Sequence, residues 1–235
     1  MITAVKYHVR RIAALLILFL VVRAGFKALL HDETSEPPVS EQETAVSAEP
    51  RRQAAASIAQ GRPVEMVVPV LGLRAGFEQA DCRVMDGKID PKSMDKACAL
   101  TGEDYPYELP GTDAGDIVVV AGHTGAGVDA VFNKLYDGKA ERHTVAEGDT
   151  LFVRTETSGE DWLKYTATDL HDSDKGALAS NAEIWGTGPM PGRLLTISCI
   201  QPANLLADSV RNAVVGWQLA GTATGDEVEM AFEPR

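Results

Sequence analysis

Residues 194–202 read LLTISCIQP, an apolar run that reaches a single cysteine, Cys199, and ends at a proline. The run has the length of a strand, and the proline marks its end. A cysteine in that place is either a small hydrophobic residue that completes the core or a nucleophile that a rigid sheet presents at its rim. The rest of the chain has to distinguish these two interpretations.

Apolar runs of similar length recur from Val64 onward. Each is rich in β-branched residues and bounded by Gly, Pro, Asp or Asn, which is typical of strands. They are VVPVLGL from Val67, DIVVVAGH from Asp116, DTLFVRT from Asp149, WLKYTATDL from Trp162, RLLTISC from Arg193, AVVGWQLAG from Ala213 and EVEMAFE from Glu227. AVFNKLYDG, from Ala130, predicts one or two helical turns. The pattern predicts a mainly β domain, a sandwich or closed barrel with short helices.

The N-terminus is basic and apolar, whereas the rest of the chain is acidic. Residues 1–30 hold five Lys or Arg and no Asp or Glu, so the remainder carries −17 within the total of −12. Ile12 to Leu30 spans 19 mostly apolar residues behind Arg10 and Arg11, enough to cross a membrane with a cytoplasmic N-terminus. A cleaved signal peptide is the alternative, but no cleavage site closely follows the apolar core. Both interpretations place most of the chain outside the cytoplasm.

Three regions follow from this pattern. Residues 1–30 are the expected cytoplasmic tip and membrane anchor, residues 31–63 a disordered acidic linker, and residues 64–235 the folded domain. A domain this acidic repels phosphate groups, and no basic patch with interleaved aromatic residues is present. Nucleic acid is therefore not expected as a partner.

The three cysteines are of two kinds. Cys82 and Cys98 lie 16 residues apart in the polar segment DCRVMDGKIDPKSMDKAC. Outside the cytoplasm this spacing predicts a disulfide bond, which stabilises a fold by roughly 3 kcal/mol. Two free thiols are the alternative, and no metal site is expected because no second Cys pair or nearby His completes one. Cys199 is then the odd cysteine and a candidate reactive thiol.

A cysteine nucleophile needs a group that transfers protons and a group that stabilises the oxyanion. Among five histidines, His123 ends the apolar run IVVVAGH and precedes a glycine-containing loop. Arg211 follows Cys199 by 12 residues and precedes the next apolar run, so an antiparallel turn would bring both to one end of the sheet. Considered alone, His123 is better explained as a histidine at the edge of the core that hydrogen-bonds the backbone, and Arg211 as an exposed surface charge.

The ordered set of His123, Cys199 and Arg211 resembles the sortases, the membrane-anchored cysteine transpeptidases of Gram-positive bacteria. Their T-L-x-T-C motif corresponds to residues 195–199, which read LTISC. Only the cysteine matches outright, Ser198 replaces the last Thr, and the first two positions depart from the motif. VVVAGH, ending at His123, resembles the histidine strand of the family, and EGDTLFV from Glu147 resembles its G-D-x-[apolar]-x-V strand. The resemblance covers about residues 64–220.

The resemblance implies a closed eight-stranded β-barrel with its active site at one end. Cys199 would attack the carbonyl after Thr in an LPXTG-like sorting signal, and His123 would transfer the protons. Arg211 would stabilise the oxyanion, and an amine of a cell-wall precursor would resolve the thioacyl enzyme. No cofactor is implied.

The resemblance also implies substrate contacts, partners and location. The expected substrate-binding residues are Ser198, Thr196, Thr124 and Trp185, with residues 171–192 as the recognition loop between strands six and seven. Expected partners are surface proteins with a C-terminal sorting signal and an amine acceptor such as a peptidoglycan precursor. The chain would sit in the cell membrane as a single-pass protein with its catalytic domain outside. EDYPYELPG, from Glu103, lacks the Asp-Pro-aromatic plug of pilin-polymerising class C enzymes, so a class E/F-like member is expected.

Two other functions stay open. One is a non-catalytic extracytoplasmic β-domain that binds wall proteins or peptides, with Cys199 as a buried hydrophobic residue. The other is a hydrolytic cysteine peptidase with the same Cys-His-Arg site, in which water resolves the intermediate. A serine hydrolase at Ser198 is not expected, because no G-x-S-x-G turn surrounds it.

Overall fold

A computed structural model describes residues 57–204 and 206–233 of the chain. The predicted membrane anchor, residues 1–30, and the predicted linker up to residue 56 lie outside the described residues. Within the part that is described, no helix is long and apolar enough to span a bilayer.

The described residues are mainly β. The strands are β1 (Pro63–Val68), β2 (Leu73–Gly76), β3 (Val84–Met85), β4 (Lys88–Ile89), β5 (Cys98–Ala99), β6 (Val118–Ala121), β7 (Tyr136–Asp137), β8 (Arg142–His143), β9 (Thr150–Thr155), β10 (Trp162–Asp174), β11 (Arg193–Cys199) and β12 (Arg211–Ala223). The helices are the short 3-10 turns η1 (Pro69–Leu71) and η2 (Leu178–Ser180), and α2 (Ala182–Trp185) and α3 (Gly225–Phe232).

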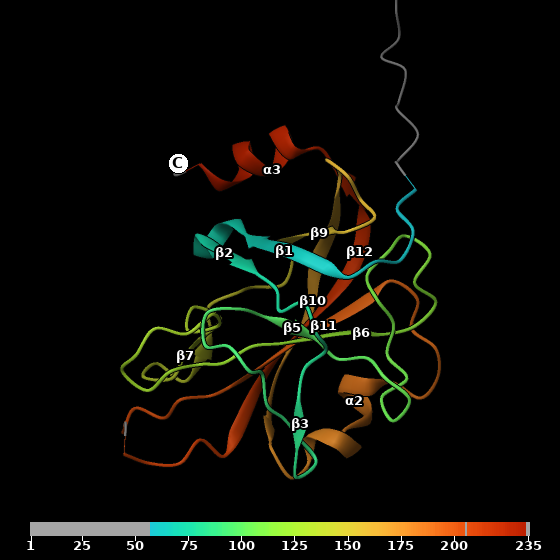
Figure 1. The fold of residues 1–235 in the computed structure, drawn as a ribbon. Coiled ribbons are helices and arrows are strands. Elements are labelled where there is room, and N and C mark those ends of the chain that lie inside the picture. The colour runs from blue at the N-terminus through green and yellow to red at the C-terminus, as the bar shows by residue number, and fades with distance from the viewer. Residues whose placement is uncertain (1–56, 205, 234–235) are drawn as a thin grey trace, which may run out of the picture. The chain divides into compact units, whose positions relative to one another are not determined.

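Eight strands form one sheet in the order β2-β1-β9-β10-β12-β11-β6-β5 (Figure 1). Neighbouring strands are antiparallel except β6 and β11, which run parallel. The two edge strands, β2 and β5, approach each other only through one isolated bridge between Phe77 and Ala97. The sheet is therefore open, and not the closed barrel that the resemblance implies. It stays open because the segment between β2 and β5 leaves the sheet and forms the separate β3–β4 hairpin.

Both faces of the central strand β11 are covered, which explains its continuous apolar run. On one face, Leu194 packs in the main core with Trp217. On the other face, Leu195 and Ile197 pack against Ile184 of α2 and the two cysteines of the polar segment. β11 is thus held between two packed layers.

The C-terminal run from Glu227 is a helix, so the strand predicted there is wrong. Thr224 caps α3 by accepting a hydrogen bond from the Glu227 backbone N–H, and the Glu227 carboxylate accepts one from the Thr224 N–H. Val228 and Phe232, four residues apart, pack in one cluster with Val67 of β1 and Phe152 of β9. The helix α3 accordingly lies next to β1 (Figure 1). The alternation of EVEMAFE suits a strand, but the capping box and the spacing of four select the helix.

Two further boundaries differ from the prediction. Ile58 is buried in the core, and its backbone N–H donates to the Thr112 hydroxyl. Residues 57–63, expected in the linker, therefore belong to the folded domain. The helical turns expected from Ala130 are hydrogen-bonded turns without a regular helix.

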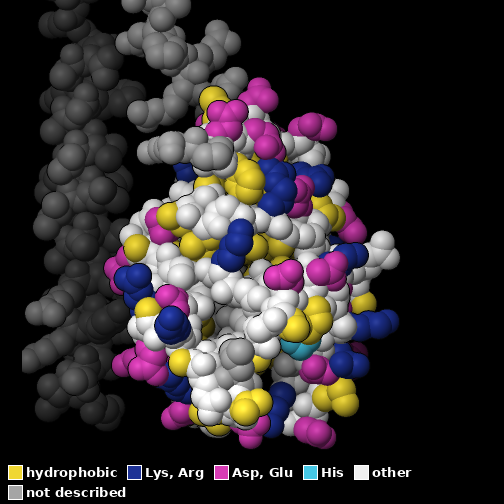
Figure 2. All heavy atoms as spheres, turned by 90° about the vertical axis from the view of Figure 1, so that its left-hand side faces the viewer, with side chains coloured by type: hydrophobic (Ala, Val, Ile, Leu, Met, Phe, Trp, Pro, Cys, Tyr) yellow, Lys and Arg dark blue, Asp and Glu magenta, His cyan; other side chains and the backbone are white. Residues whose placement is uncertain are grey.

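One face of the domain carries side chains of both charges (Figure 2). On the face shown in Figure 2, acidic and basic side chains are interspersed, and no extended basic area is visible.

Candidate active site

The parallel pair β6 and β11 brings His123 and Cys199 to the same end of the sheet. Ala121 pairs with Ile197 in this ladder, and His123 and Cys199 each follow two residues later. Residues two apart along a strand share a face, and neighbouring strands lie about 4.8 Å apart. The register therefore brings the two residues to one end of the sheet, on neighbouring segments of the chain.

Hydrogen bonds beyond the strand ends hold these two chain segments together. The Thr124 hydroxyl donates to the Cys199 carbonyl at 2.8 Å. The Gln201 amide donates to the Thr124 carbonyl at 3.0 Å and lies 3.1 Å from the Thr124 hydroxyl. Thr124, expected to contact substrate, thus ties the histidine segment to the cysteine segment. Gln201 was missed in the sequence, because only the fold brings it to Thr124.

Cys199 is a free thiol and is partly exposed. Its neighbours Ser198 and Thr196 lie on the opposite face of β11. The Thr196 hydroxyl accepts a hydrogen bond from the Trp217 indole N–H at 3.0 Å, and Thr196 is 1% exposed. Ser198 is 3% exposed, and its hydroxyl has no partner among the described residues. Both residues therefore lie in the core rather than at a substrate surface. Side chains alternate along a strand, so Ser198 points away from Cys199, and Thr196 lies on the same face as Ser198.

His123 is half-buried, and its ring is already engaged. Nε2 lies 2.6 Å from the carbonyl oxygen of Pro91, and the backbone carbonyl of His123 accepts a hydrogen bond from the Phe132 N–H. The residue before it, Gly122, has no room for a side chain, since a Cβ there would lie 2.7 Å from the Phe132 ring. The backbone that carries His123 is thus closely fixed.

Arg211 begins β12 opposite Ile200, whose N–H donates to the Arg211 carbonyl. Its guanidinium binds Asp172 at 2.7 Å and Glu141 at 3.3 Å, and the side chain is 36% exposed. By alternation, Arg211 leaves the sheet on the face opposite to Cys199. The structure therefore brings Arg211 to the correct end of the sheet but holds its charge on acidic partners.

Asn212 is a site residue that the sequence interpretation missed. It pairs directly with Cys199 in the antiparallel ladder and is 9% exposed. Because the adjacent pair of Ile200 and Arg211 is hydrogen-bonded, Cys199 and Asn212 form the closer kind of pair, with Cβ atoms about 4.5–5.5 Å apart. The available signal was a single polar residue at the start of the apolar run AVVGWQLAG.

Trp185 lies in the connection between β10 and β11, but this connection is shorter than expected. β10 extends to Asp174, so only residues 175–192 connect the strands. The Trp185 indole N–H donates to the Leu178 carbonyl at 2.6 Å, and its ring stacks on Tyr107 at 5.2 Å. Burial raises the pKa of the Tyr107 phenol. These contacts hold α2 against the face of β11 that carries Leu195 and Ile197.

An ion pair between the buried Arg193 and the partly exposed Asp169 supports the same sheet. Arg193, 5% exposed, donates to both oxygens of Asp169 at 2.8 and 2.7 Å, and His171 and Thr168 also contact this carboxylate. Burial acts to raise the pKa of Asp169, but the hydrogen bonds from these three residues outweigh it and hold the pKa well below its usual range. Gly216 makes room for the pair, since a Cβ there would lie 2.4 Å from the Asp169 carboxylate oxygens.

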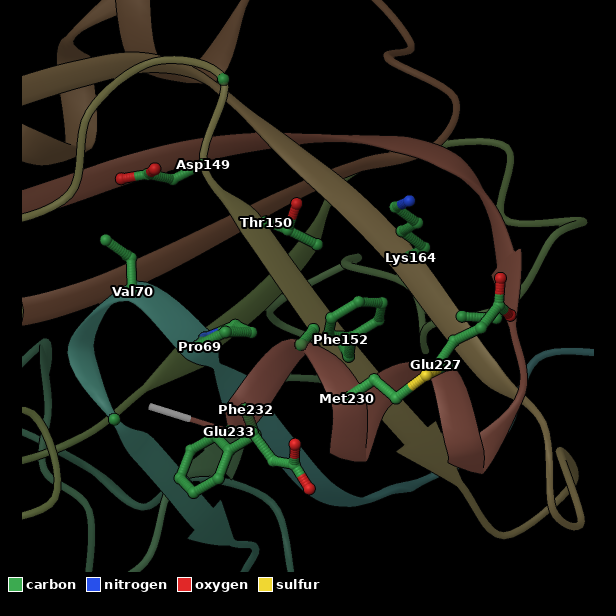
Figure 3. A pocket seen from close by; sticks show the side chains of 14 residues that line it. Pro69, Val70, Asp149, Thr150, Phe152, Lys164, Glu227, Met230, Phe232 and Glu233 are labelled. Atoms are coloured by element: carbon green, nitrogen blue, oxygen red, sulfur yellow. The ribbon is translucent and has the colours of Figure 1, made fainter. Parts of the chain in front are cut away.

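A pocket of about 840 Å³ lies at the other end of the domain, between η1, β9, β10 and α3 (Figure 3). Phe152 lies at its base, with Lys164 and Glu227 on the rim (Figure 3). No cysteine or histidine is among its lining residues. Its lining residue Ala223 is 11 residues along β12 from Asn212, about 36 Å at 3.3 Å per residue. The pocket is therefore separate from the Cys199 end of the sheet.

Among residues 57–204 and 206–233, no three His, Cys, Asp or Glu residues are grouped so that they could hold a metal ion. The polar segment does contain the disulfide bond that its spacing predicts, between Cys82 and Cys98, with Cα atoms 5.1 Å apart.

No protein-family model and no curated protein sequence matches the chain. Similar solved structures include sortase A from Listeria monocytogenes, with a TM-score of 0.49 and 14% identity over 75% of this chain and 100% of that one. Sortase C-3 from Streptococcus pneumoniae has a TM-score of 0.49 and 14% identity over 76% and 71%. Sortase C-1 from Actinomyces oris has a TM-score of 0.46 and 16% identity over 66% and 72%. At these identities the likeness does not extend to individual site residues.

Proposed function

We propose that this chain is a sortase-type cysteine transpeptidase, with Cys199 as nucleophile and His123 as the group that transfers protons. The observation that carries the proposal is the parallel pairing of β6 with β11 up to Ala121 and Ile197, which lie two residues before His123 and Cys199 at the same end of the sheet. A thiol and an imidazole on one rigid rim are the combination that nucleophilic catalysis needs. The partial exposure of Cys199 leaves the thiol open to a substrate.

The reaction follows from these groups. The Cys199 thiolate attacks the carbonyl carbon of the scissile peptide bond in an LPXTG-like sorting signal, and the C–N bond breaks as His123 gives a proton to the leaving amine. The thioacyl enzyme is then attacked by an amine, from which His123 takes a proton. The C–S bond breaks, and the new amide leaves as Cys199 returns to thiolate.

The oxyanion role proposed for Arg211 requires its guanidinium to leave Asp172 and Glu141. Both ion pairs lie at the surface, where a pair contributes about 0.2–1 kcal/mol. A well-placed oxyanion donor lowers the barrier by about 2.7–4 kcal/mol. The gain exceeds the cost, and Arg211 stands at the strand end, where a long side chain can turn across it. Asn212, already opposite Cys199, is a second donor in this proposal.

The proposed partners are surface proteins with a C-terminal sorting signal and an amine such as that of a peptidoglycan precursor. The proposed location is the outer side of the cell membrane, with residues 1–30 as a single-pass anchor. The disulfide bond supports this location, since such bonds persist in oxidising compartments. We also propose that the chain is a class E/F-like sortase.

Incubation of the purified full-length chain with LPXTG-like and LAXTG-like peptides tests the proposal. Intact-mass spectrometry should detect a thioacyl adduct on the wild type and none on Cys199→Ala. Adding a peptide with a free amino terminus should convert the adduct into a transfer product, whereas a peptidase would release only the hydrolysed peptide. If no peptide gives an adduct and Cys199 also resists alkylation, the chain is a binding domain and the proposal fails.

A further inference from the structure

The segment closed by Cys82 and Cys98 reaches across to the proposed active site. Within this 16-residue separation, Pro91 is buried, and its carbonyl oxygen lies 2.6 Å from Nε2 of His123. A carbonyl oxygen only accepts hydrogen bonds, so Nε2 must carry the proton. Nδ1 is then the nitrogen of the neutral ring that is left to accept a proton.

Several contacts fix the segment in this place. Cys98 belongs to β5 and pairs with Ala121, two residues before His123, so the disulfide bond is anchored on the strand that presents the imidazole. The Cys82 N–H donates to the Ala99 carbonyl, which holds the other half of the bond against β5. These contacts position both ends of the segment relative to His123.

The middle of the segment is held as well. The Ser93 N–H donates to the Glu78 carboxylate at 2.7 Å, two residues beyond Pro91. The Met94 carbonyl accepts a hydrogen bond from the Val131 N–H at 2.8 Å, and Val131 adjoins Phe132, which bonds the His123 backbone. The Pro91 carbonyl is therefore not on a free loop but on a segment tied down on both sides.

We propose that the Pro91 carbonyl positions the His123 imidazole and fixes its tautomer, and that the Cys82–Cys98 disulfide bond holds this carbonyl in place. The inference deepens the proposed function: nucleophilic sites commonly orient their base through a third group. Pro91 supplies that group from its backbone, so its side chain is not what acts. Opening the disulfide bond loosens the carbonyl and thereby the orientation of His123, while the sheet itself remains.

The direct test is nuclear magnetic resonance of the full-length chain with ¹⁵N-labelled histidine, at a pH where imidazole is neutral. The His123 signals are assigned by their loss in His123→Asn. The expected result is a ring proton on Nε2 that exchanges slowly enough with water to be observed. A proton on Nδ1 of His123 in the wild type overturns the proposal without any variant.

Two sets of variants test what holds the carbonyl. Glu78→Ala removes the acceptor for Ser93, and Glu78→Gln keeps an acceptor oxygen there. Exchange of the His123 ring proton should become roughly 2- to 13-fold faster in Glu78→Ala, the range expected for loss of one hydrogen bond, and should stay near wild type in Glu78→Gln. The same acceleration is expected in Cys82→Ser/Cys98→Ser and in the wild type treated with a reductant. The reductant should not change the double variant further.

The outcomes separate this inference from the proposed function, because the ring-proton measurement needs no peptide. If peptides give no thioacyl adduct but the exchange results hold, only the proposed reaction fails. If the adduct forms and all variants exchange at the wild-type rate, the disulfide bond and Glu78 do not hold the Pro91 carbonyl, and that part of the inference fails while the reaction stands. Backbone spectra of β9 and β12, recorded on uniformly ¹⁵N-labelled samples, report whether each variant is folded. If the cysteine double variant unfolds, comparison of Glu78→Ala with Glu78→Gln still tests whether the segment that carries Pro91 has to be held in place.

Discussion

Cys199 lies directly opposite Asn212 in the ladder of β11 and β12, and both side chains leave the same face of the sheet. Arg211, one residue earlier, is opposite Ile200 and leaves the other face toward Asp172. The loop between the two strands sets this register. A shift of one residue would exchange the two, since side chains alternate along a strand. Two different donors, an amide and a guanidinium, thus begin β12 on opposite faces.

Asn212→Ala should slow formation of the thioacyl adduct by roughly tenfold to a hundredfold. The amide is the cross-strand neighbour of Cys199. Loss of one preorganised donor from an oxyanion site slows a reaction by a factor on the order of 10²–10³. The expected loss is smaller here because Arg211 is a second donor in the proposed site and would still stabilise the oxyanion. Rates are measured by intact mass after rapid mixing. Asn204→Ala, in the exposed loop between β11 and β12, is the matched control and should react like the wild type. A rate for Asn212→Ala within twofold of wild type would contradict the role.

Asp172→Asn should speed adduct formation about 1.5- to 5-fold. The change weakens the stronger of the two ion pairs on Arg211, at 2.7 Å, and an exposed pair contributes about 0.2–1 kcal/mol. Glu141→Gln, whose pair is longer at 3.3 Å, should have a smaller effect in the same direction. The rates are compared in the Arg211→Ala background, where both changes should be silent. An equal acceleration in that background would show that Arg211 is not involved.

Thr224→Ala should lower the free energy of unfolding by about 1 kcal/mol, the usual cost of a lost N-cap. The measurement is urea denaturation followed by circular dichroism. Because Thr224 and Glu227 bond each other, the double variant with Glu227→Ala should cost less than the two single changes together. Glu233→Ala, at the far end of α3, is the control and should change stability little. Full additivity would mean that the capping box does not act as a unit.

Most of the sheet could be predicted because its strands have continuous apolar runs with clear ends. β9 and β11 coincide with predicted runs in length and place. β6, β10 and β12 lie where runs were predicted, but β6 is shorter than its run, and β10 and β12 are each 13 residues long where nine were predicted. α3 was missed because the alternate apolar residues of the seven-residue run EVEMAFE fit both a strand and a helix. Its capping signal, Thr224 followed by Glu227, was legible and is specific to helices. The open edge between β2 and β5 was beyond prediction, since it depends on where a polar segment folds.

The site was only partly legible for a similar reason. A strand end and its residue type are local features, so Cys199 and His123 were found as candidates. Cross-strand register depends on loop length and tertiary packing, and therefore Asn212 could not be distinguished from Arg211. The contact of Pro91 with His123 could not be predicted, because Pro91 makes it through its backbone carbonyl, which every residue has.

The ion pair of Arg193 and Asp169 gives stability a defined pH dependence. The folded-state pKa of Asp169 is lowered, so this pair stabilises the fold fully above the unfolded carboxyl pKa of about 3.9 and loses its effect as pH falls through the lower folded-state value. Asp169→Asn leaves Arg193 buried without its counter-charge, which costs about 3 kcal/mol or more at neutral pH.

Urea denaturation of the wild type and Asp169→Asn between pH 2 and pH 7 checks this sign. The difference in unfolding free energy should be constant above about pH 5 and shrink as the pH falls below about 3.9, because protonation of Asp169 then removes the same charge as the substitution. Asp208→Asn, in an exposed loop, is the matched control and should show a small difference at every pH. A difference for Asp169→Asn that grows on acidification would mean that the carboxyl is protonated in the folded state, and the ion pair with Arg193 would not be what holds the centre of the sheet.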